Sequence, residues 1–104
     1  MEMNQRRRLP NRRLSRTTLY ERDGLHFRLA AGYHPDGEIG EVFLNAGKTN
    51  STLDALTSDA AILASLALQF GCALDELRHA VKRDGTGRAA SFIGEALDRL
   101  GELS

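Results

Sequence analysis

Alternating hydrophobic and polar positions in the first half of the chain predict three β-strands, because successive side chains of a strand point to opposite faces of a sheet. The alternation is clearest at about residues 25–33, and weaker versions of it predict strands at about 16–22 and 39–46. Two turn sequences separate these segments, Arg22-Asp23-Gly24 and His34-Pro35-Asp36-Gly37. Because tight turns join neighbouring antiparallel strands, the sequence predicts an antiparallel meander.

From Ser51 onward, hydrophobic residues recur every three or four positions, which is the spacing of an amphipathic α-helix. This pattern predicts helices at about residues 52–70, 73–82 and 88–102, with Gly71 ending the first of them. The first helix is hydrophobic round most of its circumference, so we expect it to be the central element of the core. The sequence therefore predicts an α+β domain in which a three-stranded antiparallel meander is followed by three helices packed on one face.

The other face of the predicted sheet is expected to be an interface. If the hydrophobic positions of the strands face the helices, Tyr20, Arg28 and Phe43 remain on the outer face among polar neighbours. Aromatic residues and arginine in polar surroundings are typical of protein interfaces. We expect a homodimer through this face. The alternative is a monomer in which the N-terminal arm folds back and covers the sheet.

The charge of the chain is unevenly distributed. Its 104 residues fit one domain and have a formal net charge of zero, yet residues 1–16 contain six arginines against one glutamate. We therefore expect a basic, partly flexible arm at residues 1–15 and a single domain at residues 16–104. Such an arm can contact nucleic acid, an acidic partner or its own domain. The candidate contact residues are Arg6, Arg7, Arg8, Arg12 and Arg13.

The remaining composition predicts a cytoplasmic protein without a metal or cofactor. No hydrophobic stretch reaches the roughly 18 residues that cross a bilayer, and the first residues lack the hydrophobic core of a secretory signal. Cys72 is the single cysteine, which excludes an internal disulfide. The three histidines do not have metal-ligand spacing, and no residues are assigned a catalytic role.

The segment Gly47-Lys48-Thr49, between the last strand and the first helix, is similar to part of a phosphate-binding loop. A full GxxxxGK[ST] loop would need a glycine at the position of Val42, so nucleoside triphosphate hydrolysis is not expected. A weaker anion site formed by Lys48, Thr49 and Ser51 at the helix N-terminus stays open. The alternative is that Lys48 is a solvated loop residue and Ser51 a helix cap.

Longer motifs support a family resemblance. They are Gly40-Glu41-Val42-Phe43, Gly47-Lys48, Ser51, and Ser65-Leu66-Ala67-Leu68-Gln69-Phe70-Gly71. With them, residues 36–77 resemble a segment of the TSCPD domain found near the C-terminus of adenosylcobalamin-dependent ribonucleotide reductases. The arm sequence RRRLPNRR is similar to the arginine-rich segment that precedes this domain. The Thr-Ser-Cys-Pro-Asp string that names the family is absent.

The resemblance implies a free-standing relative of a reductase accessory domain. A complete reductase uses a redox cysteine pair and a large barrel, whereas this chain has one cysteine. The implied function is therefore non-catalytic protein interaction, with a ribonucleotide reductase as a possible partner. The alternative is a nucleic-acid or nucleotide-binding module that uses the arginine arm and residues 48–51.

Overall fold

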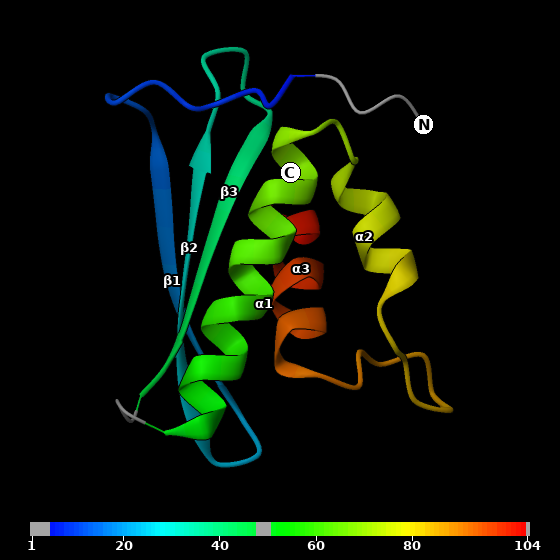
Figure 1. Cartoon of the computed structure of the whole chain (residues 1–104). Coiled ribbons are helices and arrows are strands. Elements are labelled where there is room, and N and C mark those ends of the chain that lie inside the picture. The colour runs from blue at the N-terminus through cyan, green and yellow to red at the C-terminus, as the bar shows by residue number, and fades with distance from the viewer. Residues whose placement is uncertain (1–4, 48–50, 104) are drawn as a thin grey trace.

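The computed structural model, which describes residues 5–47 and 51–103, contains three strands followed by three helices (Figure 1). The elements are β1 (Ser15–Arg22), β2 (Leu25–Tyr33), β3 (Ile39–Ala46), α1 (Thr52–Gln69), α2 (Leu74–Ala80) and α3 (Phe92–Glu102). The strands form one antiparallel sheet in the order β1-β2-β3. The helices lie on one side of this sheet (Figure 1). The predicted α+β class and strand meander are confirmed.

The third helix begins later than its hydrophobic pattern predicts. Ser91 is its N-cap, and the Ser91 Oγ accepts a hydrogen bond from the Gly94 backbone N–H at 3.0 Å. Upstream of this cap, Ala89 forms an isolated antiparallel bridge with Arg83. Residues in a β-bridge cannot also be helical, so α3 starts at Phe92.

Tyr20 lies on the inner face of the sheet, so its predicted place on the outer face is wrong. Asp23 and Gly24 form a two-residue turn, both with positive φ, and this turn sets Tyr20 opposite Phe27. Side chains opposite one another in a sheet share a face. The two rings stack with centroids 5.3 Å apart, and Tyr20 is only 5% exposed. Its hydroxyl donates a hydrogen bond to the Phe92 backbone oxygen at 3.0 Å.

The core lies between the inner face of the sheet and the helices α1 and α3. The most buried sheet residues are Phe27, Leu29, Ala31, Val42 and Leu44, and the most buried α3 residues are Ala96, Leu97 and Leu100. α2 packs against α3 and buries none of its own residues completely. Within residues 5–47 and 51–103, no helix covers the outer face of the sheet.

The edge of β3 that faces away from β2 is covered by α1, which runs beside it (Figure 1). The Gly47 N–H donates to the His26 oxygen at 2.7 Å. Because hydrogen-bonded pairs alternate along antiparallel strands, Gly40, Val42, Leu44 and Ala46 must direct their backbone groups away from β2. An edge strand usually exposes such groups to solvent or to another chain.

Polar side chains of α1 bind these edge groups. The Ala46 N–H donates to Asp54 Oδ1 at 3.1 Å, the Val42 N–H donates to Ser65 Oγ at 2.8 Å, and Gln69 Nε2 donates to the Gly40 oxygen at 2.8 Å. The distances along the two elements match, since the helix from Asp54 to Gln69 is about 22 Å long. The strand from Ala46 to Gly40 covers about 20 Å. The helix thus replaces a fourth strand.

α1 contributes Ala61 and Leu68 to the core, as expected of a core helix, but its hydrophobic residues are not buried on all sides. The helix turns its small and polar residues inward, including Thr57, Ala61 and Ser65, because the strand edge requires hydrogen-bond partners. Several of its large aliphatic residues are consequently exposed, namely Leu56 at 63%, Ile62 at 55% and Leu63 at 67%, whereas Leu68 is buried. Hydrophobicity on all sides of the helix did not specify which side is buried.

The edge contacts give a first prediction. Ser65→Ala is expected to lower the free energy of unfolding by about 1–3 kcal/mol, because the Val42 N–H loses its acceptor in a partly buried place. The matched control is Ser58→Ala, which changes another serine of α1 that faces the same edge of β3. Ser58 Oγ lies 3.5 Å from the Leu44 oxygen, at the limit of hydrogen bonding, so a loss below about 0.5 kcal/mol is expected. Urea denaturation of both variants would test this, and equal losses would contradict it.

Candidate functional site: the outer face of the sheet

The outer face of the sheet carries exposed hydrophobic side chains around one arginine. Leu19 of β1 is 74% exposed and Phe43 of β3 is 51% exposed. Strand register places Leu19, Arg28 and Asn45 in one row across the three strands, and Ala30 and Phe43 in the next row. Neighbouring rows on one face lie within reach of long side chains. Arg28 and Phe43 therefore occupy the outer face, as the sequence predicts.

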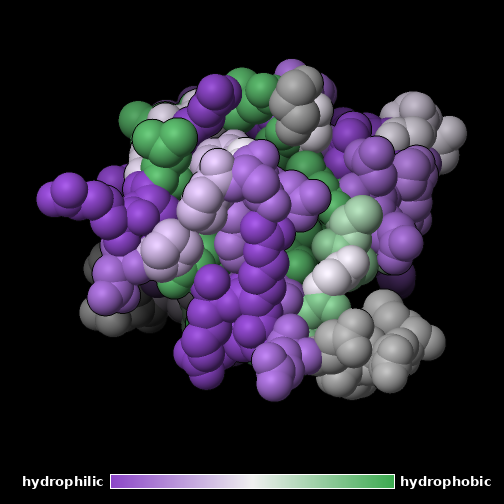
Figure 2. Space-filling model, turned by 90° about the horizontal axis from the view of Figure 1, so that it is seen from above, coloured by the Kyte–Doolittle hydropathy of each residue, from purple (hydrophilic) through white to green (hydrophobic). Residues whose placement is uncertain are grey.

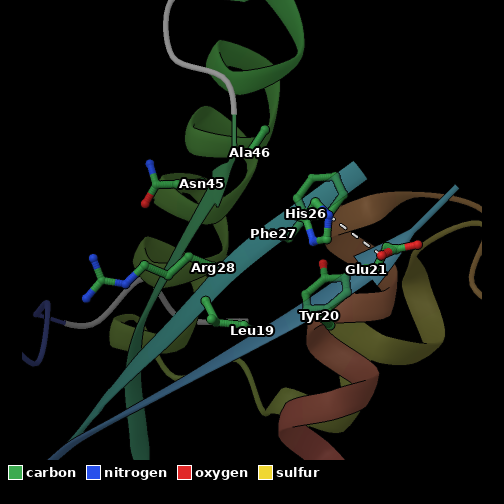
Figure 3. A pocket seen from close by; sticks show the side chains of 9 residues that line it. Leu19, Tyr20, Glu21, His26, Phe27, Arg28, Asn45 and Ala46 are labelled. Carbon is green, nitrogen blue, oxygen red and sulfur yellow. Dashed lines mark ion pairs between the residues drawn. The ribbon is translucent and has the colours of Figure 1, made fainter. Parts of the chain in front are cut away.

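Arg28 lies between two shallow depressions of this face. One depression, of about 480 Å³, is lined by Leu19, His26, Arg28 and Asn45 among others. Figure 3 shows Arg28 and Asn45 pointing away from the side of the strands on which Tyr20 lies. The second depression, of about 380 Å³, is lined by Arg28, Ala30 and Phe43 together with residues of the arm. Arg28 contributes to both.

The charges near one end of this face are already paired. Arg13 of the arm forms an ion pair with Glu41 of β3, and Arg13 Nη1 also donates to the Pro10 oxygen at 2.8 Å. The Glu41 side chain lies flat over Gly32, where a Cβ would be only 2.1 Å from Glu41 Oε2. Any larger residue at position 32 would displace Glu41 from this position. Glycine on β2 thus allows the ion pair that neutralises Glu41.

Arg28 is different, because no ion pair or hydrogen bond of its side chain is found in residues 5–47 and 51–103. At the hairpin end of the face, Glu21 and His26 lie 3.7 Å apart (Figure 3, dashed line). The outer face therefore presents an uncompensated positive charge between exposed leucine and phenylalanine side chains. A partner with a carboxylate flanked by apolar groups would match it.

The arm crosses the end of the sheet, where the β2–β3 turn lies (Figure 1). The Arg7 N–H donates to the Gln69 oxygen at 2.8 Å, and Arg6 Nε donates to the Gln69 side chain. Arg7 also pairs with Asp36 at 2.6 Å and Glu38 at 3.1 Å. The Glu38 backbone N–H and Arg7 both donate to Asp36 and hold the pKa of its carboxyl below the ordinary value.

These contacts divide the arm arginines into two groups. Arg6, Arg7 and Arg13 bind the domain, whereas Arg8 and Arg12 have no side-chain partner among the described residues. Figure 2 looks onto this end of the molecule and shows mainly hydrophilic surface with hydrophobic patches between. Among the described residues, the arm reaches the outer face at its Glu41 end through Arg13, and Leu19 and Phe43 remain exposed.

The predicted anion site is described only in part. Lys48 and Thr49 lie outside the described residues. Ser51 is the N-cap of α1, and its Oγ accepts a hydrogen bond from the Asp54 N–H at 3.0 Å. Asp54 adds a negative charge at the same helix end. The anion site stays a prediction.

Comparison with curated proteins shows that the sequence of this chain is similar to part of one kind of enzyme. The chain resembles a short segment of vitamin B12-dependent ribonucleotide reductases. It is 35% identical to the Bradyrhizobium diazoefficiens enzyme over 74 residues, which are 71% of this chain and 6% of that protein. Identity to the Agrobacterium fabrum enzyme is 38% over 72 residues, 69% of this chain and 6% of that protein. For the Streptantibioticus cattleyicolor enzyme it is 37% over 70 residues, 67% of this chain and 12% of that protein.

The chain thus spans only about a tenth or less of the length of these reductases. The comparison supports a module related to a ribonucleotide reductase segment. No family model matches the chain. No solved structure matches it either.

The reductase likeness makes the environment of Cys72 relevant. Burial raises the pKa of the Cys72 thiol, and the nearby Glu76 carboxylate raises it further. A raised pKa disfavours the thiolate, which is the nucleophilic form. The adjacent depression, of about 600 Å³, also contains Arg78, whose charge is paired with Asp75 and Asp98. The one arginine lining this depression is therefore neutralised by acidic neighbours and does not favour the thiolate.

In the part of the chain that the structure describes, no group of three or more histidine, cysteine or acidic residues could hold a metal ion. Within the same residues, no helix is both long enough and apolar enough to cross a membrane.

Sequence reasoning missed Leu19 as an outer-face residue and named Tyr20 instead. A signal was present, since a two-residue turn at Asp23-Gly24 fixes the pairing of Arg22 with Leu25. Counting back from that pair places Tyr20 opposite Phe27 and leaves Leu19 on the face of Arg28. The register, rather than the hydrophobicity of the strand, identifies the exposed residue.

Proposed function

We propose that this chain is a TSCPD-like accessory module that binds another protein through the outer face of its sheet and has no catalytic activity of its own. Arg28 supports this proposal most strongly, because its side chain has no partner in the described part of the chain and lies between exposed Leu19 and Phe43. Arginine and aromatic residues dominate binding energy in many interfaces. A surface of this kind suits a protein partner with an acidic and apolar segment.

The positions of the family-like motif residues support a structural role for that motif. In β3, the Gly40 backbone oxygen accepts a hydrogen bond from Gln69, and the Val42 backbone N–H donates one to Ser65. Gln69 also binds the arm through Arg6 and Arg7. The motif therefore joins β3, α1 and the arm, and leaves Phe43 on the outer face. These residues form a scaffold that presents a surface.

The arm contacts favour a protein partner over nucleic acid. Arginines that bind phosphates must be available, but Arg6, Arg7 and Arg13 are occupied by Gln69 and acidic residues of the same chain. Only Arg8 and Arg12 of the five candidate arginines lack such partners in the described residues. Two cations would give a weak dependence of affinity on salt. The partner we propose is a vitamin B12-dependent ribonucleotide reductase.

Binding to a purified reductase tests this proposal. The reductase of Agrobacterium fabrum should be prepared whole and without the segment that resembles this chain. We expect the chain to bind the shortened reductase more tightly, because the enzyme's own segment then no longer competes. Arg28→Glu should weaken this binding at least about tenfold, as expected for an arginine at the centre of an interface. Biolayer interferometry would measure both effects.

Two matched variants distinguish binding through the outer face from a general effect of exposed hydrophobic residues. Phe43→Ser should weaken binding, whereas Leu63→Ser on α1, a residue 67% exposed, should leave it unchanged. Absence of binding to either form of the reductase would exclude it as the partner. Equal losses in the two serine variants would exclude the outer face as the binding surface.

A further inference from the structure

The two edges of the sheet differ in a way that the reductase likeness does not explain. The edge of β3 is bound by polar side chains of α1, as described above. The edge of β1 has no covering element among the described residues. An uncovered edge strand offers a row of N–H and C=O groups to another strand.

The hydrogen-bond pattern identifies which β1 residues face outward. The Tyr33 N–H donates to the Leu14 oxygen at 3.0 Å, next to the paired Ser15 and Gly32. Hydrogen-bonded pairs alternate along antiparallel strands, so even-numbered residues of β1 bind β2. The outward groups therefore belong to Ser15, Thr17, Leu19 and Glu21. No other hydrogen bond to these backbone groups is present in residues 5–47 and 51–103.

A hydrophobic depression adjoins this edge on the inner side of the sheet. It measures about 350 Å³ and is lined by Arg16, Thr17, Thr18, Leu29, Leu100 and Leu103. Leu103, just after α3, is 48% exposed. A strand added to β1 would bring side chains over this depression. The edge thus offers apolar contact as well as backbone hydrogen bonds.

We infer that the occupant of this edge is a second copy of the chain, paired antiparallel through β1 about a two-fold axis at Thr18. In this register the outward residues form hydrogen-bonded pairs, Thr17 with Leu19 and Ser15 with Glu21. Thr18 faces Thr18 of the second copy, and cross-strand threonine pairs are favourable. The two sheets become one six-stranded sheet. This inference goes beyond the proposed binding of a reductase and does not depend on it.

Charge supports this register over its neighbour. With the axis at Thr18, Arg16 lies opposite Tyr20 of the second copy, and like charges do not face one another directly. Arg99 lies 4.4 Å from the Tyr20 ring, but its own charge is paired with Glu95 at 2.9 Å. With the axis at Leu19, Arg16 would instead face Arg22 directly. Like charges opposite one another destabilise a sheet pair.

Cysteine cross-linking tests the register. Thr18 of the two copies would form a non-hydrogen-bonded pair, with Cα atoms about 4.5 Å apart, within the range of a disulfide. In a Cys72→Ser background, Thr18→Cys should give a disulfide-linked dimer under mild oxidation. Thr17→Cys in the same background should not, because position 17 faces position 19. Cross-linking of both variants alike, or of neither, would overturn the inference.

Solution mass gives an independent readout. Light scattering at micromolar concentration should give twice the chain mass of 11.4 kDa for the full chain. Thr17→Pro should return the monomer, since it removes an outward N–H and leaves the β1–β2 hydrogen bonds intact. Phe43→Asp on the outer face should remain dimeric. A monomeric full chain, or a dimer lost in Phe43→Asp and kept in Thr17→Pro, would overturn the inference.

Discussion

Phe27→Ala is expected to lower the free energy of unfolding by about 3–5 kcal/mol. Phe27 is 1% exposed, and its ring lies between those of Tyr20 at 5.3 Å and Phe92 at 4.5 Å. Its removal leaves a cavity at the contact between the sheet and α3, where neighbouring side chains relax only in part. Guanidinium denaturation followed by circular dichroism would measure the loss.

Phe43→Ala is the matched control, because it makes the same chemical change on the other face of the sheet. Phe43 is 51% exposed, so its truncation is expected to cost less than about 1 kcal/mol. Similar losses in the two variants would contradict the described core. The pair also separates stability from binding, since Phe43 rather than Phe27 belongs to the proposed interface.

Glu95→Ala is expected to cost about 2–4 kcal/mol, because it leaves the buried Arg22 with a weaker partner. The Arg22 side chain is 7% exposed, and its Nη1 lies 2.9 Å from Glu95 Oε1. The remaining acidic neighbour, Asp23, is 3.6 Å away and largely exposed. Adding Arg22→Met should recover part of the loss, since the buried charge is then removed as well. Glu102→Ala, an exposed change on the same helix, should cost less than about 0.5 kcal/mol.

The pH dependence of stability gives a second readout for Glu95. Burial alone would raise the pKa of Glu95, but hydrogen bonds from Arg99 and Arg22 outweigh it and lower the pKa below the ordinary 4.5. Because the folded-state pKa is lowered, the ionised Glu95 carboxylate contributes to stability above pH 4.5. This contribution is lost as the pH falls through the folded-state pKa and the carboxylate is protonated. The stability of Glu95→Ala should therefore vary less with pH below 4.5 than that of the unchanged chain. Identical pH profiles of the two proteins would contradict a stabilising contribution of the Glu95 ion pairs.

The strands were predictable because their signals are local. Alternation in residues 25–33 and the two glycine turns place each strand boundary within one residue of the structure. The faces of β1 were assigned wrongly from the sequence, because its Thr17-Thr18-Leu19-Tyr20 segment has no clear alternation. Its orientation depends on register with β2, which is a property of two strands and one turn. Pairing information was therefore needed to assign Tyr20 to the core.

The orientation of α1 illustrates a different limit. Its hydrophobic residues occur on nearly all sides, so the helix pattern does not define a buried face. The buried face is set by Asp54, Ser65 and Gln69, whose partners lie on β3. The outer-face position of Arg28 could be predicted from the alternation of its own strand. That Arg28 has no ion pair among the described residues could not be predicted, because pairing depends on the folded positions of the arm and of Glu41.

The cover that α1 provides also determines how far strand addition can proceed. A sheet with two open edges can keep adding molecules and grow into a fibre. In this fold one edge is permanently terminated by hydrogen bonds within the chain, and that termination is built into the same helix that contributes to the core. Any strand added at β1 by an identical molecule uses the open edge of both molecules at once. Growth then stops after a single step, so the fold favours a closed assembly of defined size over a polymer.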